Sequence, residues 1–212
     1  MKKITLITAV IAAFACFFAC TNRQLEELTD ATTTENLKTA IIGESNASAK
    51  YALISEQALN QGQDGIAAMF EAASAAEALH VQHHILVLND LGEGIEVIPD
   101  LQISENLEEN IQDAIDGETY EYTEMYPPMI EQANKEDLVD AVRTFTYAKK
   151  AEERHAKLYT ETLALLKAGK SDEIAKIWYV CPLCGNLFNT LEGYEICAIC
   201  GAGKNTFIHF EK

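Results

Sequence analysis

Ala151-Glu152-Glu153-Arg154-His155 lies inside a long helix-like run and contains the pattern Glu152-x-x-His155. On an α-helix, residues three apart lie on the same face, so this carboxylate and this imidazole can bind one cation together. The pattern recurs as Glu77-Ala78-Leu79-His80, and Glu118-Thr119-Tyr120-Glu121 is a version with carboxylates alone. Glu44 stands by itself in a fourth apolar run. The recurrence predicts one shared metal site rather than separate solvated pairs.

Four long helices are predicted around these motifs, because inward-facing residues step by three and four along each run. The first opens at a capping box, Thr32-x-x-Glu35, and ends at Gln61-Gly62. The second follows and ends before a connection over about Leu91–Leu101, where glycine and proline break the pattern. The third meets Pro127-Pro128, which should kink or end it. The fourth begins near Leu138 and stops near Gly169.

The acidic residues are predicted to lie at one height in this bundle. If the first two helices form a hairpin, the midpoint between Glu44 and Glu77 falls at the turn, at Asn60-Gln61. The midpoint between Glu118 and Glu152 falls at Lys135, where the second turn is expected. Each acid then lies about 25 Å from its turn, at about 1.5 Å per residue. The longer middle connection lets the second hairpin cross over and pack on the first.

This geometry puts five carboxylates and two imidazoles in the core of a bundle. Burying even one ionised carboxylate without compensation costs several kcal/mol, and two divalent or trivalent cations would supply that compensation. A glutamate from each of two helices with Glu-x-x-His from each of the other two is the di-iron carboxylate arrangement. The alternative is that four surface stripes align by chance. The predicted ligands are Glu44, Glu77, His80, Glu118, Glu121, Glu152 and His155.

A second metal site is predicted near the C-terminus from two Cys-x-x-Cys-Gly knuckles. The cysteines are Cys181, Cys184, Cys197 and Cys200, with twelve residues between the knuckles. This spacing is typical of a tetrahedral four-thiolate site. The spacing does not distinguish a structural zinc from a single iron that carries one electron, because thiolates suit both metals.

Composition sets limits on the function. The chain has 212 residues, a hydrophobic fraction of 48% and a formal net charge of −17. A chain of this length and apolar content can fold around a sizeable core, and more than one domain is expected. The acidic balance argues against nucleic acid as a partner, because nucleic-acid binding needs a basic surface.

The first twenty residues are predicted to be an export signal. Lys2 and Lys3 precede a nearly continuous apolar run, Ile4–Ala19, and Phe17-Phe18-Ala19-Cys20 resembles a loose lipobox with Cys20 as the lipidated residue. Cleavage after Ala13-Phe14-Ala15 and an uncleaved anchor are the alternatives. Residues 21–32 are predicted to be a polar tether. The protein is therefore expected to be periplasmic or membrane-anchored, touching a membrane only through this segment, or cytoplasmic if the segment is not a signal.

Both metal motifs, in this order, resemble the rubrerythrin family over roughly residues 33–212. The resemblance rests on Gly43-Glu44, Gly117-Glu118-x-x-Glu121, Glu124-Met125-Tyr126-Pro127, the two Glu-x-x-His motifs and both cysteine knuckles. It implies a mainly α fold: a ferritin-like four-helix di-iron domain over 33–169, followed by a small rubredoxin-like four-cysteine β-domain over 170–212.

The resemblance also implies roles for individual residues. Glu77 and Glu152 would bridge two irons, and His80 would be a switch ligand that exchanges with Glu121 as the redox state changes. Tyr51 and Tyr126 match family tyrosines that hydrogen-bond the ligand carboxylates, although ordinary core aromatics would fit those positions equally well. The terminal ligands would be Glu44, Glu118, Glu121 and His155.

Two features depart from the family. His84 lies one turn past His80, where the family usually has an apolar residue; it is expected to be a satisfied core histidine, with a partner to a ligand and an extra ligand as alternatives. His83 lies off the seam and is expected to be solvated. The export signal is the second departure, because most rubrerythrins are cytoplasmic.

The resemblance implies a non-haem di-iron peroxidase active in oxidative-stress defence. Hydrogen peroxide would be reduced to water with electrons from an unidentified donor, relayed through one iron held by the four cysteines, where zinc is also possible. A head-to-tail homodimer would place the rubredoxin-like domain of one subunit over the di-iron site of another. A ferroxidase or iron-handling protein, and a non-enzymatic metal-binding redox sensor, are the alternatives.

Overall fold

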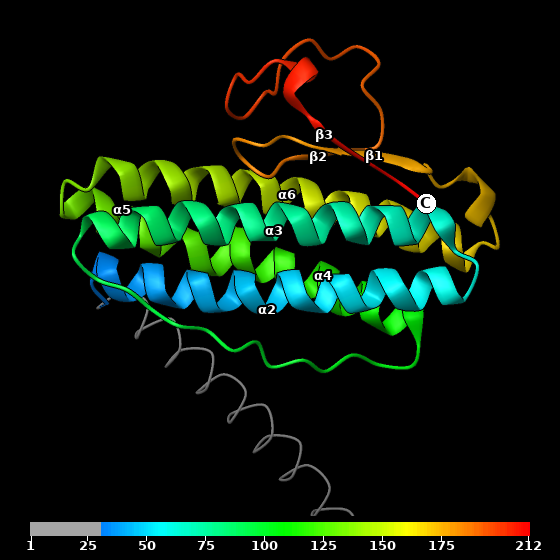
Figure 1. Cartoon of the computed structure of the whole chain (residues 1–212), viewed down its shortest axis with the longest axis horizontal. Coiled ribbons are helices and arrows are strands. Elements are labelled where there is room, and N and C mark those ends of the chain that lie inside the picture. The colour runs from blue at the N-terminus through cyan, green and yellow to red at the C-terminus, as the bar shows by residue number, and fades with distance from the viewer. Residues whose placement is uncertain (1–30) are drawn as a thin grey trace, which may run out of the picture.

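The computed structural model describes residues 31–212, which form a helical bundle with a small β-domain on one side (Figure 1). The first hairpin consists of α2 (Thr33–Asn60) and α3 (Asp64–Asp90). The second consists of α4 (Leu107–Tyr120), the π-helix η1 (Glu121–Met125), α5 (Tyr126–Lys135) and α6 (Val139–Lys167). The predicted signal and all but the end of the predicted tether lie outside the described residues.

The helix ends confirm the boundaries that local chemistry predicts. At the start of α2, the Thr32 hydroxyl accepts a hydrogen bond from the Glu35 amide at 3.3 Å, and the Glu35 carboxylate accepts one from the Thr32 amide at 2.8 Å. Gln61 caps the other end of α2. In the second hairpin, α5 ends at Lys135. Both turns therefore lie at the predicted midpoints between the acidic residues of each hairpin.

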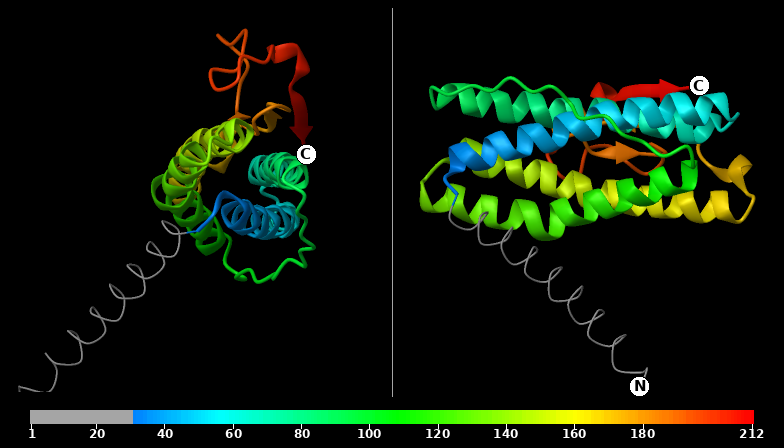
Figure 2. Two further views of the ribbon diagram at one scale, coloured as in Figure 1. Left: turned by 90° about the vertical axis from the view of Figure 1, so that its left-hand side faces the viewer. Right: turned by 90° about the horizontal axis from the view of Figure 1, so that it is seen from below.

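The crossover between the hairpins runs along the outside of α2 for most of the length of the bundle (Figures 1 and 2). Hydrogen bonds tie it down: the Asp100 amide donates to Asn46 Oδ1 at 3.0 Å, and Gln57 Nε2 donates to the Ser104 carbonyl at 2.9 Å. Because this segment returns the chain to the far end of the bundle, the second hairpin packs beside the first with its acids facing inward.

The third predicted helix is neither simply kinked nor ended at its two prolines, because a π-helical segment interrupts it before them. It changes from α4 to the π-helix η1 at Glu121, and Pro127 and Pro128 then occupy the first turn of α5. Proline has no amide hydrogen, so the carbonyls four residues earlier receive no α-helical hydrogen bond. A short π-helical turn absorbs this break, and such turns occur often at functional sites. Here it begins at a predicted ligand.

The C-terminal domain is built on a three-stranded antiparallel sheet with strand order β2-β1-β3. Its strands are β1 (Ile177–Val180), β2 (Leu187–Phe188) and β3 (Ile208–Glu211), and Val180 pairs with Leu187 on one side and with Ile208 on the other. Two short 3-10 helices, η2 (Ser171–Glu173) and η3 (Lys204–Thr206), complete it. Over residues 31–212, no helix combines the length and apolarity needed to span a membrane.

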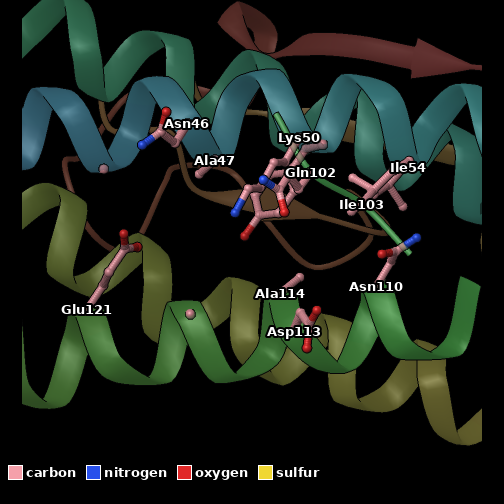
Figure 3. Close-up of a pocket in the computed structure, with 13 residues that line it drawn as sticks. Asn46, Ala47, Lys50, Ile54, Gln102, Ile103, Asn110, Asp113, Ala114 and Glu121 are labelled. Atoms are coloured by element: carbon pink, nitrogen blue, oxygen red, sulfur yellow. The ribbon is translucent and has the colours of Figure 1, made fainter. Parts of the chain in front are cut away.

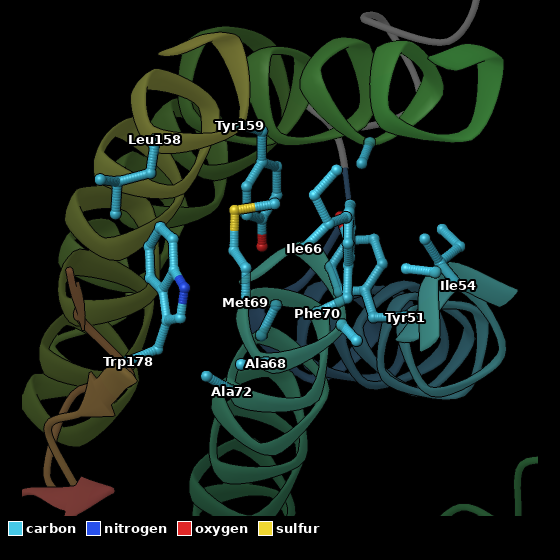
Figure 4. Close-up of a cluster of buried hydrophobic side chains, with 14 of the residues drawn as sticks. Tyr51, Ile54, Ile66, Ala68, Met69, Phe70, Ala72, Leu158, Tyr159 and Trp178 are labelled. Carbon is cyan, nitrogen blue, oxygen red and sulfur yellow. The ribbon is translucent and has the colours of Figure 1, made fainter. Parts of the chain in front are cut away.

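Trp178 fixes this domain to the bundle. Its side chain is 1% exposed and lies in the same cluster as Met69 and Leu158 (Figure 4). The indole Nε1 donates to the Gly65 carbonyl at 3.1 Å and to the Ala175 carbonyl at 2.8 Å. Gly65 permits this approach, because a Cβ there would lie 2.9 Å from the Ala175 carbonyl oxygen. The β-domain therefore shares the hydrophobic core of the bundle.

The apolar core is divided into two clusters. One surrounds Phe70, Tyr159 and Trp178, and the other surrounds Leu37, Met129 and Phe145. The buried charged residues of α2, α3, α4 and α6 lie between these clusters along the bundle. The predicted metal site is thus enclosed by close-packed hydrocarbon at both ends.

Replacing Trp178 with alanine should lower the free energy of unfolding by about 3–5 kcal/mol, because it removes a fully buried aromatic side chain and two hydrogen bonds. The neighbouring Ile177 is 37% exposed, and Ile177→Ala should cost less than about 1 kcal/mol. Urea denaturation followed by circular dichroism compares the two variants. Equal destabilisation would show that Trp178 does not anchor the domain.

Candidate metal centres

Six of the seven predicted bundle ligands converge in the core. One group consists of Glu44, Glu77, His80 and Glu152, and the other of Glu77, Glu118, Glu152 and His155; in each, the ligand atoms lie within 4.8 Å of one another. The six side chains are at most 2% exposed. Glu77 and Glu152 belong to both groups, so each can offer one oxygen to each of two cations.

The distances around the two histidines repeat one pattern. His80 Nδ1 lies 2.8 Å from Glu77 Oε2 and 3.0 Å from Glu152 Oε1. His155 Nδ1 lies 3.2 Å from Glu77 Oε1 and 2.9 Å from Glu152 Oε2. Despite these short distances, both Nδ1 atoms and both carboxylates of Glu77 and Glu152 lack a well-aligned hydrogen bond. These atoms converge within 4.8 Å of one another in each group, which is the arrangement that metal ligands require.

Backbone carbonyls of the first cysteine knuckle set the tautomer of both histidines. His80 Nε2 lies 3.1 Å from the Cys184 carbonyl, and His155 Nε2 lies 3.0 Å from the Gly185 carbonyl. A carbonyl can only accept, so each Nε2 carries the hydrogen. Once deprotonated, each Nδ1 therefore has a free lone pair for a metal ion, and the carbonyl that accepts from Nε2 fixes the orientation of the ring.

The electrostatics of the cluster show the cost of assembling it without cations. Burial raises the pKa of Glu44 to about 7, and the Glu152 carboxylate adds to this increase. Burial also raises the pKa of Glu118 well above its ordinary value. For His80, carboxylates led by Glu152 outweigh the effect of burial and raise the pKa well above normal. The metal-free cluster therefore holds protons at the positions where metals would bind.

Glu121, the seventh predicted ligand, does not join either group. It is half-buried at the start of η1 and lines a cavity of about 200 Å³ between α2, α4 and the crossover (Figure 3). Gly43 faces it across this cavity, where a Cβ would lie 3.7 Å from Glu121 Oε1. His80 thus lies inside the cluster of ligand atoms, and Glu121 lies outside it.

Two predicted tyrosines hydrogen-bond the outer carboxylates. Tyr51 donates to Glu118 Oε1 at 2.6 Å, and Tyr126 donates to Glu44 Oε1. Burial raises the pKa of both hydroxyls well above the ordinary value, so both stay protonated as donors. Sequence reasoning missed Tyr159, whose buried ring stacks on His155 with centroids 6.0 Å apart. Its position one turn after His155 on the inward face was the available signal.

The four cysteines converge as their spacing predicts. Their Sγ atoms lie within 4.8 Å of one another, with 3.4 Å between Cys181 and Cys200 and 3.5 Å between Cys184 and Cys197. A disulfide requires about 2.05 Å, so these pairs are not bonded to each other. The edge of a tetrahedron with metal–sulfur bonds of about 2.3 Å is roughly 3.8 Å, so a single zinc or iron fits among the four atoms.

The knuckle also brings the two centres together. Gly185 has φ of +73°, and a Cβ there would overlap the His80 ring. The cysteine site therefore lies against the histidines of the same chain. The family resemblance implies this contact between two subunits, whereas here the bundle and the β-domain of one chain form it. Nine residues, 168–176, connect α6 to β1, and Trp178 holds the sheet against the bundle. Homodimer formation stays a prediction.

These two centres define a class of protein: a ferritin-like bundle with a carboxylate–histidine di-metal site, joined to a rubredoxin-like four-cysteine domain. The chain belongs to the rubrerythrin family, whose family model matches residues 35–163. Members of this family bind a di-iron centre, and the orphaned ligand atoms of this chain fit one. The four-cysteine cluster fits the rubredoxin-type iron.

Known relatives cover most of the chain. It is 39% identical to Rubrerythrin-2 of Clostridium acetobutylicum over 183 residues, which are 85% of this chain and 98% of that protein. It is 37% identical to nigerythrin of Nitratidesulfovibrio vulgaris, over 82% of this chain and 85% of that protein. A structure of nigerythrin in a mixed-valence state superposes with a TM-score of 0.77 at 35% identity, covering 84% of this chain and 86% of the other.

Gly185→Ala should separate the two centres. Gly201, in the second knuckle, has a similar φ of +79° but no atom within 4 Å of an added Cβ, so Gly201→Ala is the matched control. Both variants carry the strain of a left-handed non-glycine residue, of the order of 1 kcal/mol. Only Gly185→Ala should in addition expose residues 168–176 to limited proteolysis. Similar digestion of both variants would contradict the close contact with His80.

Metal-free protein should lose stability as the pH rises from 5 to 8. Glu44 keeps its proton in the folded state up to a pKa of about 7, whereas the unfolded group ionises near 4.5, so folding becomes less favourable between these values. His80 and His155 have raised pKa values, so their contribution is present at pH 5 and declines as the pH rises towards those values. Glu77, with its pKa lowered to about 2, is ionised throughout this range.

Urea denaturation of chelator-treated protein at pH 5 and pH 8 measures this effect. Iron-loaded protein is the control, because metals bind the deprotonated ligands and should reduce or reverse the loss at pH 8. A metal-free protein that is more stable at pH 8 than at pH 5 would refute the assignment of this cluster as a cation site.

Proposed function

We propose that the chain is a non-haem di-iron peroxidase that reduces hydrogen peroxide to water: H2O2 + 2 H⁺ + 2 e⁻ → 2 H2O. The supporting observation is the contact between the two centres. His80 and His155 face the carboxylate cluster with Nδ1 and hydrogen-bond the first cysteine knuckle with Nε2. A thiolate-bound iron held this close to a di-iron site is placed to exchange electrons with it, which a purely structural zinc would not require.

When bound, the di-iron centre supplies two electrons to the substrate, and the four-cysteine iron returns them one at a time. The protein residues hold this chemistry in place. Glu77 and Glu152 would bridge the two irons, while Tyr51 and Tyr126 hold the outer carboxylates of Glu118 and Glu44 by hydrogen bonds. The flanking apolar clusters exclude water, which limits the escape of reactive oxygen species.

Glu121 and the cavity beside it would allow the set of metal ligands to change. The cavity beside it, about 200 Å³ in volume, also reaches Lys50 and Tyr51 and is large enough for a molecule as small as peroxide. Glu121 would approach the metals when His80 withdraws, and it lies at the first residue of the π-helix η1, a kind of helical turn that is frequent at functional sites. Exchange of these two ligands would let the same residues hold irons in both the ferrous and the ferric state.

A ferroxidase is the second candidate. The cavity that contains Glu121 also contains Asp113, so two carboxylates line one route towards the bundle core. Such a lining would attract Fe²⁺ as a substrate rather than as a resident cofactor. Repeated oxidation of added Fe²⁺ with mineral formation would support this alternative.

Stopped-flow mixing of diferrous protein with peroxide or oxygen tests the proposal. Peroxide should oxidise the di-iron centre at least about ten times faster than oxygen at equal concentration, because the site is proposed to be organised for peroxide. Protein without the β-domain metal should react in one turnover and then stop, since its electron return is lost. An oxidation by peroxide no faster than that by oxygen would contradict the peroxidase assignment.

A further inference from the structure

His84 is fully buried and makes hydrogen bonds with both ring nitrogens. Nε2 lies 3.1 Å from the Tyr126 hydroxyl, and Nδ1 lies 3.0 Å from the Thr144 hydroxyl. It belongs to neither group of converging metal ligands. The expectation of a satisfied core histidine is therefore consistent with the structure, but its two partners also connect it to the metal site through Tyr126.

The direction of each hydrogen bond follows from the one that Tyr126 donates to Glu44. The single hydrogen of the Tyr126 hydroxyl is donated to Glu44 Oε1, so the Tyr126 oxygen must accept from His84 Nε2. His84 then carries its hydrogen on Nε2, and Nδ1 must accept from the Thr144 hydroxyl. Burial lowers the pKa of His84 well below its ordinary value, and nearby His80 adds to this, which agrees with a neutral ring. All three hydrogen bonds thus point towards Glu44.

The outer end of this chain reaches a second cavity. Thr144 lines a space of about 330 Å³, together with His83 and Arg143 on the bundle and Leu183 in the first cysteine knuckle. Arg143 pairs with Asp140 at 2.7 Å, and both lie in this lining, so charged and polar groups surround the Thr144 end. Glu121 lines a different cavity, on the side of α2 and α4.

We infer that Thr144, His84 and Tyr126 form a proton relay from this second cavity to Glu44 at the metal site. A hydronium ion or a buffer acid in the cavity gives a proton to Thr144 as Thr144 passes its own proton to His84 Nδ1. His84 passes its Nε2 proton to Tyr126, and Tyr126 passes its proton to Glu44. None of the three relay groups changes net charge. Rotation of the two hydroxyls and a flip of the His84 ring, during which the ring proton returns from Nδ1 to Nε2, restore the starting state.

This inference rests on the proposed function, because each peroxide takes up two protons as well as two electrons. The relay residues Thr144, His84 and Tyr126 lie outside the lining of the cavity at Glu121, and Thr144 lines the second cavity. A side-chain relay supplies protons at the face of the bundle near the knuckle, while peroxide has the cavity at Glu121. Protons and substrate would then reach the metals from separate sides.

The first test reads the tautomer without measuring activity. The full chain is loaded with diamagnetic zinc, and the histidine side-chain nitrogens are assigned by ¹⁵N NMR at pH 7. His84 should be neutral, with a protonated Nε2 that exchanges slowly with solvent. A protonated Nδ1, or an imidazolium, would reverse or break the chain and overturn the relay.

The second test uses Thr144, because valine has the shape of threonine without its hydroxyl. Single-turnover oxidation of the iron-loaded protein by peroxide should be about tenfold slower or more in Thr144→Val, with an altered solvent deuterium isotope effect. Thr144→Ser keeps the hydroxyl and should restore both the rate and the isotope effect. Thr160→Val is the control on the same helix, since the Thr160 hydroxyl donates to the Ala156 carbonyl, away from the relay.

The two hypotheses can fail separately. If Thr144→Val matches the wild type in rate and isotope effect, the relay is refuted even if peroxide is the substrate. If the wild type does not prefer peroxide, the proposed function fails, and the variants are compared with oxygen as oxidant: O2 + 2 H⁺ + 2 e⁻ → H2O2. That reaction also consumes protons at the site, so a loss in Thr144→Val with recovery in Thr144→Ser would support the relay, and no difference would overturn it.

Discussion

Uncompensated negative charge in the core is the constraint on which this structure depends. Glu44, Glu77, Glu118 and Glu152 are essentially inaccessible to water, and several of their oxygens have no hydrogen-bond partner. Each ionised carboxylate would cost several kcal/mol in such surroundings. Without metals, protonation and the two histidines reduce this cost; with metals, two cations replace the protons. The four helices therefore require a cofactor to reach the stability that their packing allows.

The small β-domain also helps to form the site that binds these cations, because it orients two of the ligands. Its knuckle carbonyls accept from the Nε2 atoms of His80 and His155 and so leave the Nδ1 atoms to the metals. The glycine at 185 allows the close approach, and Trp178 holds the sheet against the bundle. One contact thus orients two ligands and places a second redox metal beside them. Changes at this interface should affect both centres.

Local patterns in the sequence predicted much of this arrangement. The capping box at Thr32, the turns after Asn60 and Lys135, and the Glu-x-x-His spacing are local signals, and all appear in the structure. The displacement of Glu121 was not predictable, because it depends on a π-helical turn and on His80 occupying the cluster. The Gly185 contact with His80 and the two hydrogen bonds of His84 join residues that are at least 42 positions apart. Periodicity along one helix does not reveal such contacts.

The number and position of the metals test the central requirement most directly. Crystals of the iron-loaded protein, with anomalous diffraction recorded on both sides of the iron edge, should show three peaks per chain. Two should lie between Glu77 and Glu152, and one among the four cysteine sulfurs. A fully folded, iron-saturated protein with no peak between Glu77 and Glu152 would show that these buried carboxylates are compensated in some other way.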